Sequence, residues 1–166
     1  MSLVYITQGQ HAVGREPEMI ITTILGSCIS ICLWDPEARV GGMNHLLLPD
    51  ARSGGNSLSE GAVDMDLLIN RMMPLGALRP RLRAKIFGGS SMLGGRTDIG
   101  QRNAEFGRDY LRSEGIPCDA ESLGGDKARR LRFWPANGQA QMKLVKEEAP
   151  APKPVPAPVG NDVDLF

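Results

Sequence analysis

Three short apolar runs follow one another near the start of the chain and constrain the fold more than any other feature. Residues 20–25, 29–34 and 43–48 are too short for typical helices, and the first is rich in β-branched side chains. Gly26-Ser27 and Asp35-Pro36 interrupt the chain after the first two runs, and Pro49 ends the third. The segment therefore predicts closely connected strands. Residues 39–40 belong to the same predicted strand as 43–48, and further strands are predicted at 3–8, 84–87, 118–122, 130–134 and 139–145.

Two segments have helical periodicity instead. Residues 62–73 carry a wide apolar face suited to packing on a sheet, with Ser59 as the expected cap. Residues 99–114 form the second predicted helix, which Gly115 ends. Many strands with two helices predict an α+β domain.

The composition excludes several classes of protein. The 166 residues include 19 Lys and Arg and 19 Asp and Glu, so the basic surplus of a typical nucleic-acid-binding protein is absent. No apolar run approaches the roughly 20 residues of a membrane helix, and no secretory signal is recognised at the N-terminus. The three cysteines are an odd number in a chain of this size, which favours reduced thiols and a cytoplasmic location.

The last part of the chain differs from the rest in composition. Prolines recur between residues 150 and 158 in an Ala- and Val-rich stretch, which favours extended polyproline conformations. We predict a folded domain over 1–146 and a disordered tail over 147–166. The apolar end, residues 163–166, is either a docking peptide or a solvated terminus.

Cys28 is the best candidate nucleophile. It follows Gly26-Ser27 directly after a predicted strand, where a tight turn exposes backbone N–H groups and can aim a side chain out of the sheet. A thiol of ordinary pKa needs a base, and a neighbouring imidazole would lower its pKa. His45 lies in an apolar run, whereas His11 lies in a polar stretch and is expected to be exposed. Pattern alone leaves open that Cys28 is inert packing and His45 a hydrogen-bonded core residue.

Other groups of residues give weaker signals. Cys32 in mid-strand and Cys118 are expected to be packing residues. A zinc site is disfavoured because four strand steps would separate the sulfurs of Cys28 and Cys32 by roughly 13 Å. "GGSSMLGG" lacks the lysine of a phosphate-binding loop, which leaves turn residues near a site or a flexible loop. Basic clusters at 78–85 and 126–132 are solvated faces or surfaces that steer an acidic protein partner.

One family resemblance covers about residues 4–146. "TTILGSCISICLWDPEARVGGMNHLLLP" closely resembles the core signature of the chemoreceptor glutamine deamidase CheD. Blocks at 67–77, 84–92, 99–116 and 123–138 match in the same order. Two departures are Glu60-Gly61-Ala62 before the first helix and Asp126 after the late Gly-Gly, and they bear on substrate or partner contacts rather than on the catalytic residues.

The resemblance implies an active site and a reaction. Cys28 is the implied nucleophile, His45 the general acid and base, and Thr22 the residue that orients His45. The turn at Gly26 and Ser27 would stabilise the oxyanion. The implied reaction converts glutamine side chains to glutamate through a thioester, with release of ammonia and without metal or cofactor.

The resemblance also implies partners and a fold. The implied substrate is the cytoplasmic helices of chemoreceptors, and a CheC-type phosphatase is a possible second partner. The expected fold has layered mixed β-sheets with helices packed on one side, similar to toxin-type cysteine deamidases. Two rival functions remain: a binding module that keeps the fold, and a cysteine protease or transglutaminase-like acyl transferase.

Overall fold

The strands form two mixed five-stranded sheets. The computed structural model describes residues 2–49, 57–92, 99–146 and 163–166. In the outer sheet the strands lie in the order β1 (Ser2–Tyr5), β3 (Met19–Leu25), β8 (Ala128–Trp134), β9 (Gln139–Val145) and β10 (Asp164–Leu165). In the inner sheet the order is β2 (His11–Gly14), β5 (Val40–Asn44), β4 (Ile29–Asp35), β6 (Arg83–Gly88) and β7 (Cys118–Leu123). The β1–β3 and β6–β7 pairs are parallel, and the others are antiparallel.

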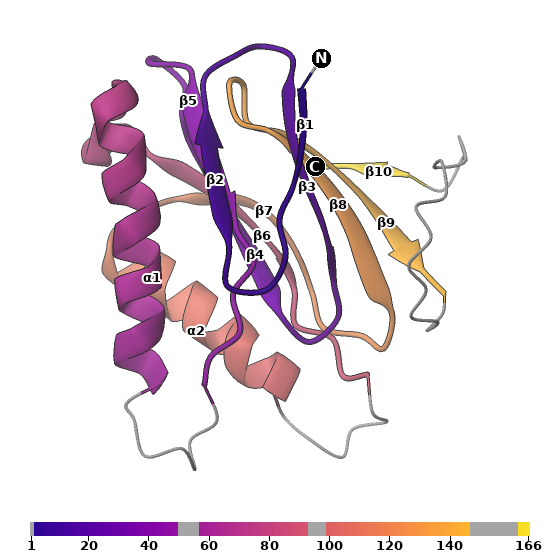
Figure 1. Ribbon diagram of the computed structural model, residues 1–166. Coiled ribbons are helices and arrows are strands. Elements are labelled where there is room, and N and C mark those ends of the chain that lie inside the picture. The colour runs from indigo at the N-terminus through magenta and orange to yellow at the C-terminus, as the bar shows by residue number, and fades with distance from the viewer. Residues whose placement is uncertain (1, 50–56, 93–98, 147–162) are drawn as a thin grey trace.

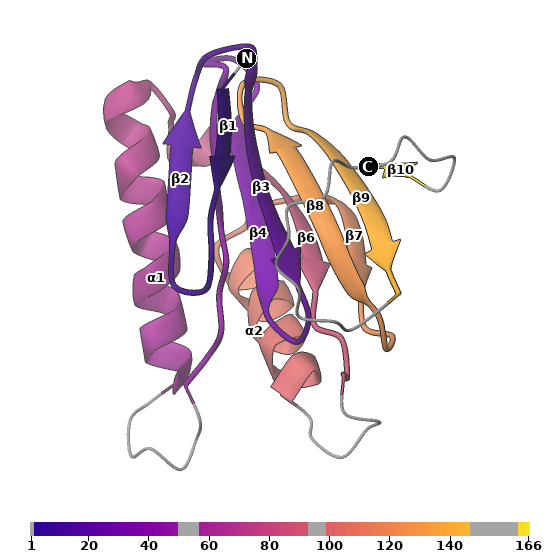
Figure 2. The same cartoon turned by 45° about the vertical axis from the view of Figure 1, so that its right-hand side comes forward.

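Both helices pack on one side. Helix α1 (Ser57–Met72) and helix α2 (Ile99–Ser113) lie against the inner sheet, on the side away from the outer sheet (Figures 1 and 2). Short 3₁₀ turns at Met73–Leu75 and Arg79–Arg81 lead from α1 into β6. The prediction of an α+β fold with layered sheets and helices on one side is therefore confirmed.

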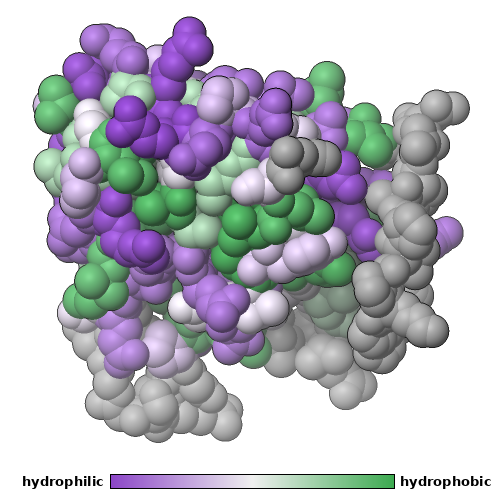
Figure 3. Space-filling view, turned by 45° about the horizontal axis from the view of Figure 1, so that its top comes forward, coloured by the Kyte–Doolittle hydropathy of each residue, from purple (hydrophilic) through white to green (hydrophobic). Residues whose placement is uncertain are grey.

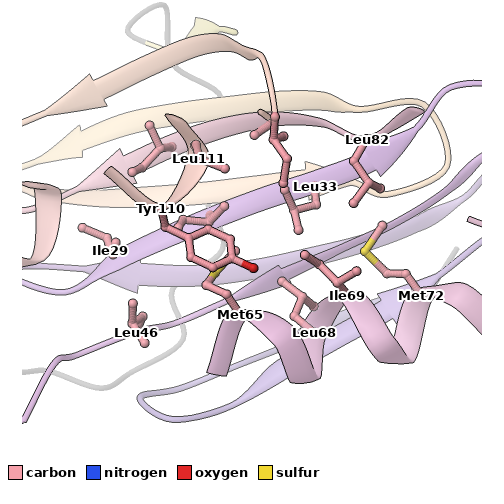
Figure 4. Close-up of a cluster of buried hydrophobic side chains, with 14 of the residues drawn as sticks. Ile29, Leu33, Leu46, Met65, Leu68, Ile69, Met72, Leu82, Tyr110 and Leu111 are labelled. Carbon is pink, nitrogen blue, oxygen red and sulfur yellow. The ribbon is translucent and has the colours of Figure 1, made fainter. Parts of the chain in front are cut away.

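Strand β4 separates two apolar layers. Successive strand side chains point to opposite faces, and every residue of β4 is buried. Ile29, Ile31 and Leu33 face the helices, and Figure 4 shows Ile29 and Leu33 in one cluster with side chains of α1. Cys32 and Trp34 belong to the layer between the sheets. The segment that starts at Cys28 thus contributes to both cores.

The other face of the outer sheet is covered by no helix of the described residues. Tyr5 and Ile24 are exposed there, whereas Ile21 and Leu25 are fully buried between the sheets. Hydrophobic residues also gather in the middle of the face shown in Figure 3, among hydrophilic ones. None of the helices in the described parts of the chain is both long and apolar enough to span a membrane.

Several boundaries differ from the sequence-based predictions. Helix α1 begins at Ser57, so Ser59 lies inside the helix and is not its cap. The polar stretch around His11 forms β2, where His11 is half-buried, because β5 offers it a partner strand.

The end of the chain also differs from the prediction. Residues 147–162 of the predicted tail lie outside the described residues, but Asp164–Leu165 form β10 on the edge of the outer sheet. The physical reason is local: β9 offers an unpaired edge, and Phe166 finds an aromatic neighbour in Phe87.

Candidate active site

The turn that carries Cys28 crosses from one sheet to the other. Strand β3 of the outer sheet ends at Leu25, and β4 of the inner sheet begins at Ile29. Three carbonyls of this turn are held from outside: Gly26 O accepts from Ser90 N at 3.0 Å, Ser27 O from Asn103 Nδ2 at 2.8 Å, and Cys28 O from Gly89 N at 2.9 Å. The turn is therefore fixed by its carbonyl groups.

The N–H groups of the same turn remain available. No acceptor among the described residues is found for the backbone N–H of Ser27 or Cys28. Two adjacent backbone N–H groups without a protein acceptor, next to a thiol, suit an oxygen that arrives with a substrate. The oxyanion role of the turn at Gly26 and Ser27 stays a prediction, for which the N–H groups of Ser27 and Cys28 are the available donors.

Asn103 joins this turn to the segment that follows His45. Its side chain is 1% exposed, donates from Nδ2 to Ser27 O, and accepts at Oδ1 from Leu48 N at 3.0 Å. One buried amide of α2 thus fixes two segments that are far apart in the sequence. The contact was not predicted because α2 offered only an amphipathic pattern.

The register of β4 and β5 places Cys28 diagonally from His45. Ile29 and Leu46 exchange backbone hydrogen bonds of 3.0 and 2.7 Å, and Cys32 lies opposite Met43 in the same register. The register therefore places Ser30 opposite His45. Cys28 is two residues before Ser30 on the same face, and diagonal neighbours of this kind have Cβ atoms within about 8 Å.

The His45 ring is bonded to Thr23. The Thr23 hydroxyl lies 2.7 Å from His45 Nδ1 and 2.7 Å from the carbonyl oxygen of Ile6. A carbonyl only accepts, so the single hydroxyl hydrogen goes to Ile6, and Thr23 accepts from Nδ1–H. The proton of neutral His45 is therefore on Nδ1, which leaves the Nε2 lone pair free to act as a base.

The prediction that Thr22 orients His45 is wrong. The Thr22 hydroxyl donates to Leu131 O at 2.8 Å, on the neighbouring strand β8. The prediction counted six alternating steps back from Cys28, but the Gly26–Cys28 turn breaks the strand alternation. Thr23 shares the inter-sheet face with Ile21 and Leu25, and this face is the one His45 lies against.

Both members of the Cys28–His45 pair are neutral in the free protein. Each is 8% exposed. Burial raises the pKa of the Cys28 thiol to about 11 and lowers the pKa of His45. Cys28 Sγ makes no hydrogen bond to His45 or to any other described residue. The expected lowering of the thiol pKa by the imidazole is therefore absent from the free structure.

The segment after β6 braces the Cys28 turn. Gly88 has a φ of 115°, and a side chain there would collide with the Cys28 carbonyl. Buried Arg129 donates to the carbonyls of Gly88 and Gly124 and to the hydroxyls of Ser90 and Ser122. The first residues of "GGSSMLGG" are therefore turn residues beside the site, which was one of the two interpretations left open by the sequence. The bracing role of Arg129 was missed because "DKARRLR" indicated only a basic cluster.

The other candidate residues lie apart from this arrangement. Cys32 is fully buried, which raises the pKa of its thiol, and Cys118 is exposed on β7. His11 pairs with Asn44 in the β2–β5 register rather than with a cysteine. No group of three or more His, Cys, Asp or Glu side chains in the described ranges is arranged to hold a metal ion.

Comparison with known proteins then identifies the family. The model of the family described as "CheD chemotactic sensory transduction" matches residues 47–144. A protein of Caulobacter vibrioides named probable chemoreceptor glutamine deamidase CheD is 46% identical, over 98% of this chain and 92% of that protein. Proteins of the same name from Caulobacter sp. strain K31 and Agrobacterium fabrum are 48% and 42% identical, over 98% of this chain and 90% and 96% of theirs.

The chain belongs to the CheD family.

The two departures from the CheD pattern lie at different places in the fold. Gly61 is inside α1, and a side chain there would collide with Leu48 and Phe106. Asp126 is in an exposed turn before β8, 3.6 Å from the ammonium of Lys127. Gly61 therefore permits close packing of α1 on the segment after His45, whereas Asp126 is a surface feature.

Proposed function

We propose that this CheD-family chain is a cysteine-dependent protein-glutamine deamidase that acts on chemoreceptors. The observation that carries the proposal is the Thr23–His45 bond, which places the proton of a neutral imidazole on Nδ1 and its lone pair on Nε2. Cys28 follows a turn with two unpaired N–H groups, diagonally from that ring. The names of the relatives supply the substrate class.

The first half-reaction forms a thioester. His45 Nε2 accepts the proton of the Cys28 thiol while Sγ attacks the carboxamide carbon of a glutamine side chain. The N–H groups of Ser27 and Cys28 stabilise the oxyanion of the tetrahedral intermediate. His45 then donates this proton to the carboxamide nitrogen, the C–N bond breaks, and ammonia leaves.

The second half-reaction hydrolyses the thioester. His45 Nε2 accepts a proton from water as the water oxygen attacks the thioester carbon, and the same N–H pair stabilises the new oxyanion. The C–S bond breaks, Sγ regains its proton from His45, and glutamate is released. The chain's own residues supply every proton transfer in this scheme, and Thr23 keeps His45 in one tautomer throughout.

The neutral resting pair explains how the thiol avoids unwanted chemistry. With the Cys28 pKa at about 11, only about one thiol in 10,000 is ionised at pH 7. Attack then depends on a substrate that brings the carboxamide to Sγ while His45 takes the proton. Because the proposed substrate is the cytoplasmic helices of receptors, we also propose a cytoplasmic location. A CheC-type phosphatase is proposed as a second partner, which co-purification would test.

Peptide mass spectrometry on receptor cytoplasmic fragments tests the proposal. We expect Gln→Glu conversion with the wild-type protein, none above background with Cys28→Ala, and near wild-type conversion with Cys32→Ala. Activity of Cys28→Ala, or its loss in a folded Cys32→Ala variant, would refute the assignment of the nucleophile. Binding without conversion would favour a binding module, and products joined to an added amine would favour an acyl transferase.

A further inference from the structure

The last residues of the chain occupy a built site on the edge of the outer sheet. Strand β10 pairs with β9, with Asp164 opposite Met142 and Leu165 opposite Gln141. Phe166 continues the ladder: its N–H donates to Ala140 O at 2.8 Å, and its carbonyl accepts from Ala140 N at 3.3 Å. An extended segment is thus bound by main-chain hydrogen bonds to an otherwise open sheet edge.

The ring of Phe166 enters the layer between the two sheets. It meets the ring of Phe87 edge to face, with centroids 5.2 Å apart and planes at 87°. Phe166 packs against the same buried cluster that includes Phe87 and Ala140. Alternation along the strand points Leu165 the other way, where it is 67% exposed. The site therefore distinguishes Phe166 from its neighbour.

Lys85 closes the site at its far end. Its ammonium donates to the carbonyl oxygens of Phe166 at 2.5 Å and Gly138 at 2.7 Å, and it lies 5.2 Å from the centre of the Trp34 ring. No acidic side chain in the described residues forms an ion pair with Lys85. Its hydrogen-bonding capacity is instead directed at the main chain of the docked segment and of the β8–β9 turn.

The connection to this segment is far longer than the geometry needs. Residues 146–163 separate β9 from β10, although the two strands are antiparallel neighbours that a two- to five-residue turn could join. The segment itself contributes only a two-residue strand and one aromatic ring. We expect so small a contact, on a covalent connection of this length, to be reversible, with an effective concentration on the order of millimolar.

We propose that the edge of β9, Phe87 and Lys85 form a docking site for an extended peptide that carries a phenylalanine, and that residues 163–166 are its tethered ligand. The main chain of β9 binds the peptide backbone, the inter-sheet layer takes the phenylalanine ring, and Lys85 binds the carbonyl oxygen of the same phenylalanine. The occupant comes from the same chain, and it detaches and rebinds on its tether. This site is independent of the proposed deamidation.

A labelled peptide of residues 161–166 tests the proposal on full-length protein by fluorescence anisotropy. Phe166→Ala empties the ring site without shortening the chain, so we expect this variant to bind the peptide about tenfold or more tightly than wild type does. Adding Lys85→Ala to that variant should reverse the gain. Leu165→Ala is the matched control, because its exposed side chain leaves the tethered competitor intact, and it should bind like wild type.

Several outcomes would overturn the proposal. Equal binding to wild type and Phe166→Ala, or no binding to either, would mean that the site does not recognise the peptide. A peptide with alanine in place of phenylalanine should not bind, and binding at equal strength would contradict recognition of the ring. A wild-type dimer that Phe166→Ala abolishes, seen by gel filtration, would mean that the occupant comes from a second copy.

Discussion

Cys28 and Cys32 lie on the same face of one short segment, yet their surroundings differ in what chemistry they permit. Both belong to the layer between the sheets, and burial raises the pKa of both thiols. Cys32 is paired on both sides in mid-strand, opposite Met43 and Lys85. Cys28 lies one residue before the strand, with unpaired N–H groups beside it and His45 diagonally across.

The difference shows that placement separates the two cysteines, since burial raises the pKa of both thiols and makes neither an acidic one. A mid-strand residue has its backbone groups committed to neighbouring strands, so no donor remains for an oxyanion. A residue in the turn keeps those donors while three bound carbonyls keep it rigid. The predictions below test this comparison by removing one support at a time.

Loss of the base should have the largest effect. We expect His45→Gln to lower the deamidation rate about 1,000-fold, because no described side chain replaces Nε2 as proton acceptor. His11→Gln is the matched control on β2 and should retain activity within a fewfold range. The measurement is the initial rate of ammonia release from a receptor fragment. Equal losses in the two variants would remove the distinction between the histidines.

The two adjacent threonines should separate by function. Thr23→Val keeps the shape but removes the acceptor for Nδ1–H, so the imidazole loses its fixed tautomer and kcat should fall about 10- to 100-fold. Thr22→Val removes only the bond to Leu131 O and should keep kcat while lowering stability by about 1 kcal/mol. Thr23→Ser should restore most of the activity. A larger kcat loss in Thr22→Val than in Thr23→Val would instead support Thr22 as the residue that orients His45.

The reaction should lose rate on the acid side. Burial lowers the pKa of His45 below 6.5, and the base form is the neutral one. Activity is therefore present above the His45 pKa and falls as the pH drops through it, about tenfold one unit below. The Cys28 pKa of about 11 keeps the thiol neutral across the plateau. A profile that rises continuously from pH 7 to 10 would instead indicate attack by a preformed thiolate.

The sequence predicted the elements of this site better than their contacts. Short apolar runs with strong turn residues specify β3, β4 and the turn at Cys28, because local patterns and turn geometry suffice there. The family resemblance supplied Cys28 and His45. It did not supply Thr23, because the sheet change within the turn alters which face each threonine occupies. Asn103 and Arg129 bond to residues that are distant in the sequence, and no local pattern predicts such contacts. Asn103, for example, is 76 residues from Ser27, to which it donates.

Removing the clamp between the two segments should have a moderate effect. Asn103→Ala frees Ser27 O and Leu48 N, so the turn and the segment after His45 lose their shared partner. We expect kcat to fall about tenfold, with a loss of about 1–3 kcal/mol in the free energy of unfolding from the unpaired buried groups. Gln101→Ala on the exposed side of α2 is the control. An unchanged kcat in a destabilised Asn103→Ala would assign the residue to stability alone.

The smallest effect on activity is expected from substitution of Cys32. Cys32→Ala leaves a small gap beneath Met43 and should lower the free energy of unfolding by about 1–2 kcal/mol. Activity at a temperature where the variant is folded should stay within about threefold of wild type. Cys32 and Cys28 share a face and differ in backbone pairing. Retained activity in Cys32→Ala together with lost activity in Cys28→Ala would therefore identify the turn as the source of reactivity. A Cys32→Ala variant that is stable but inactive would instead place the reacting thiol inside the strand.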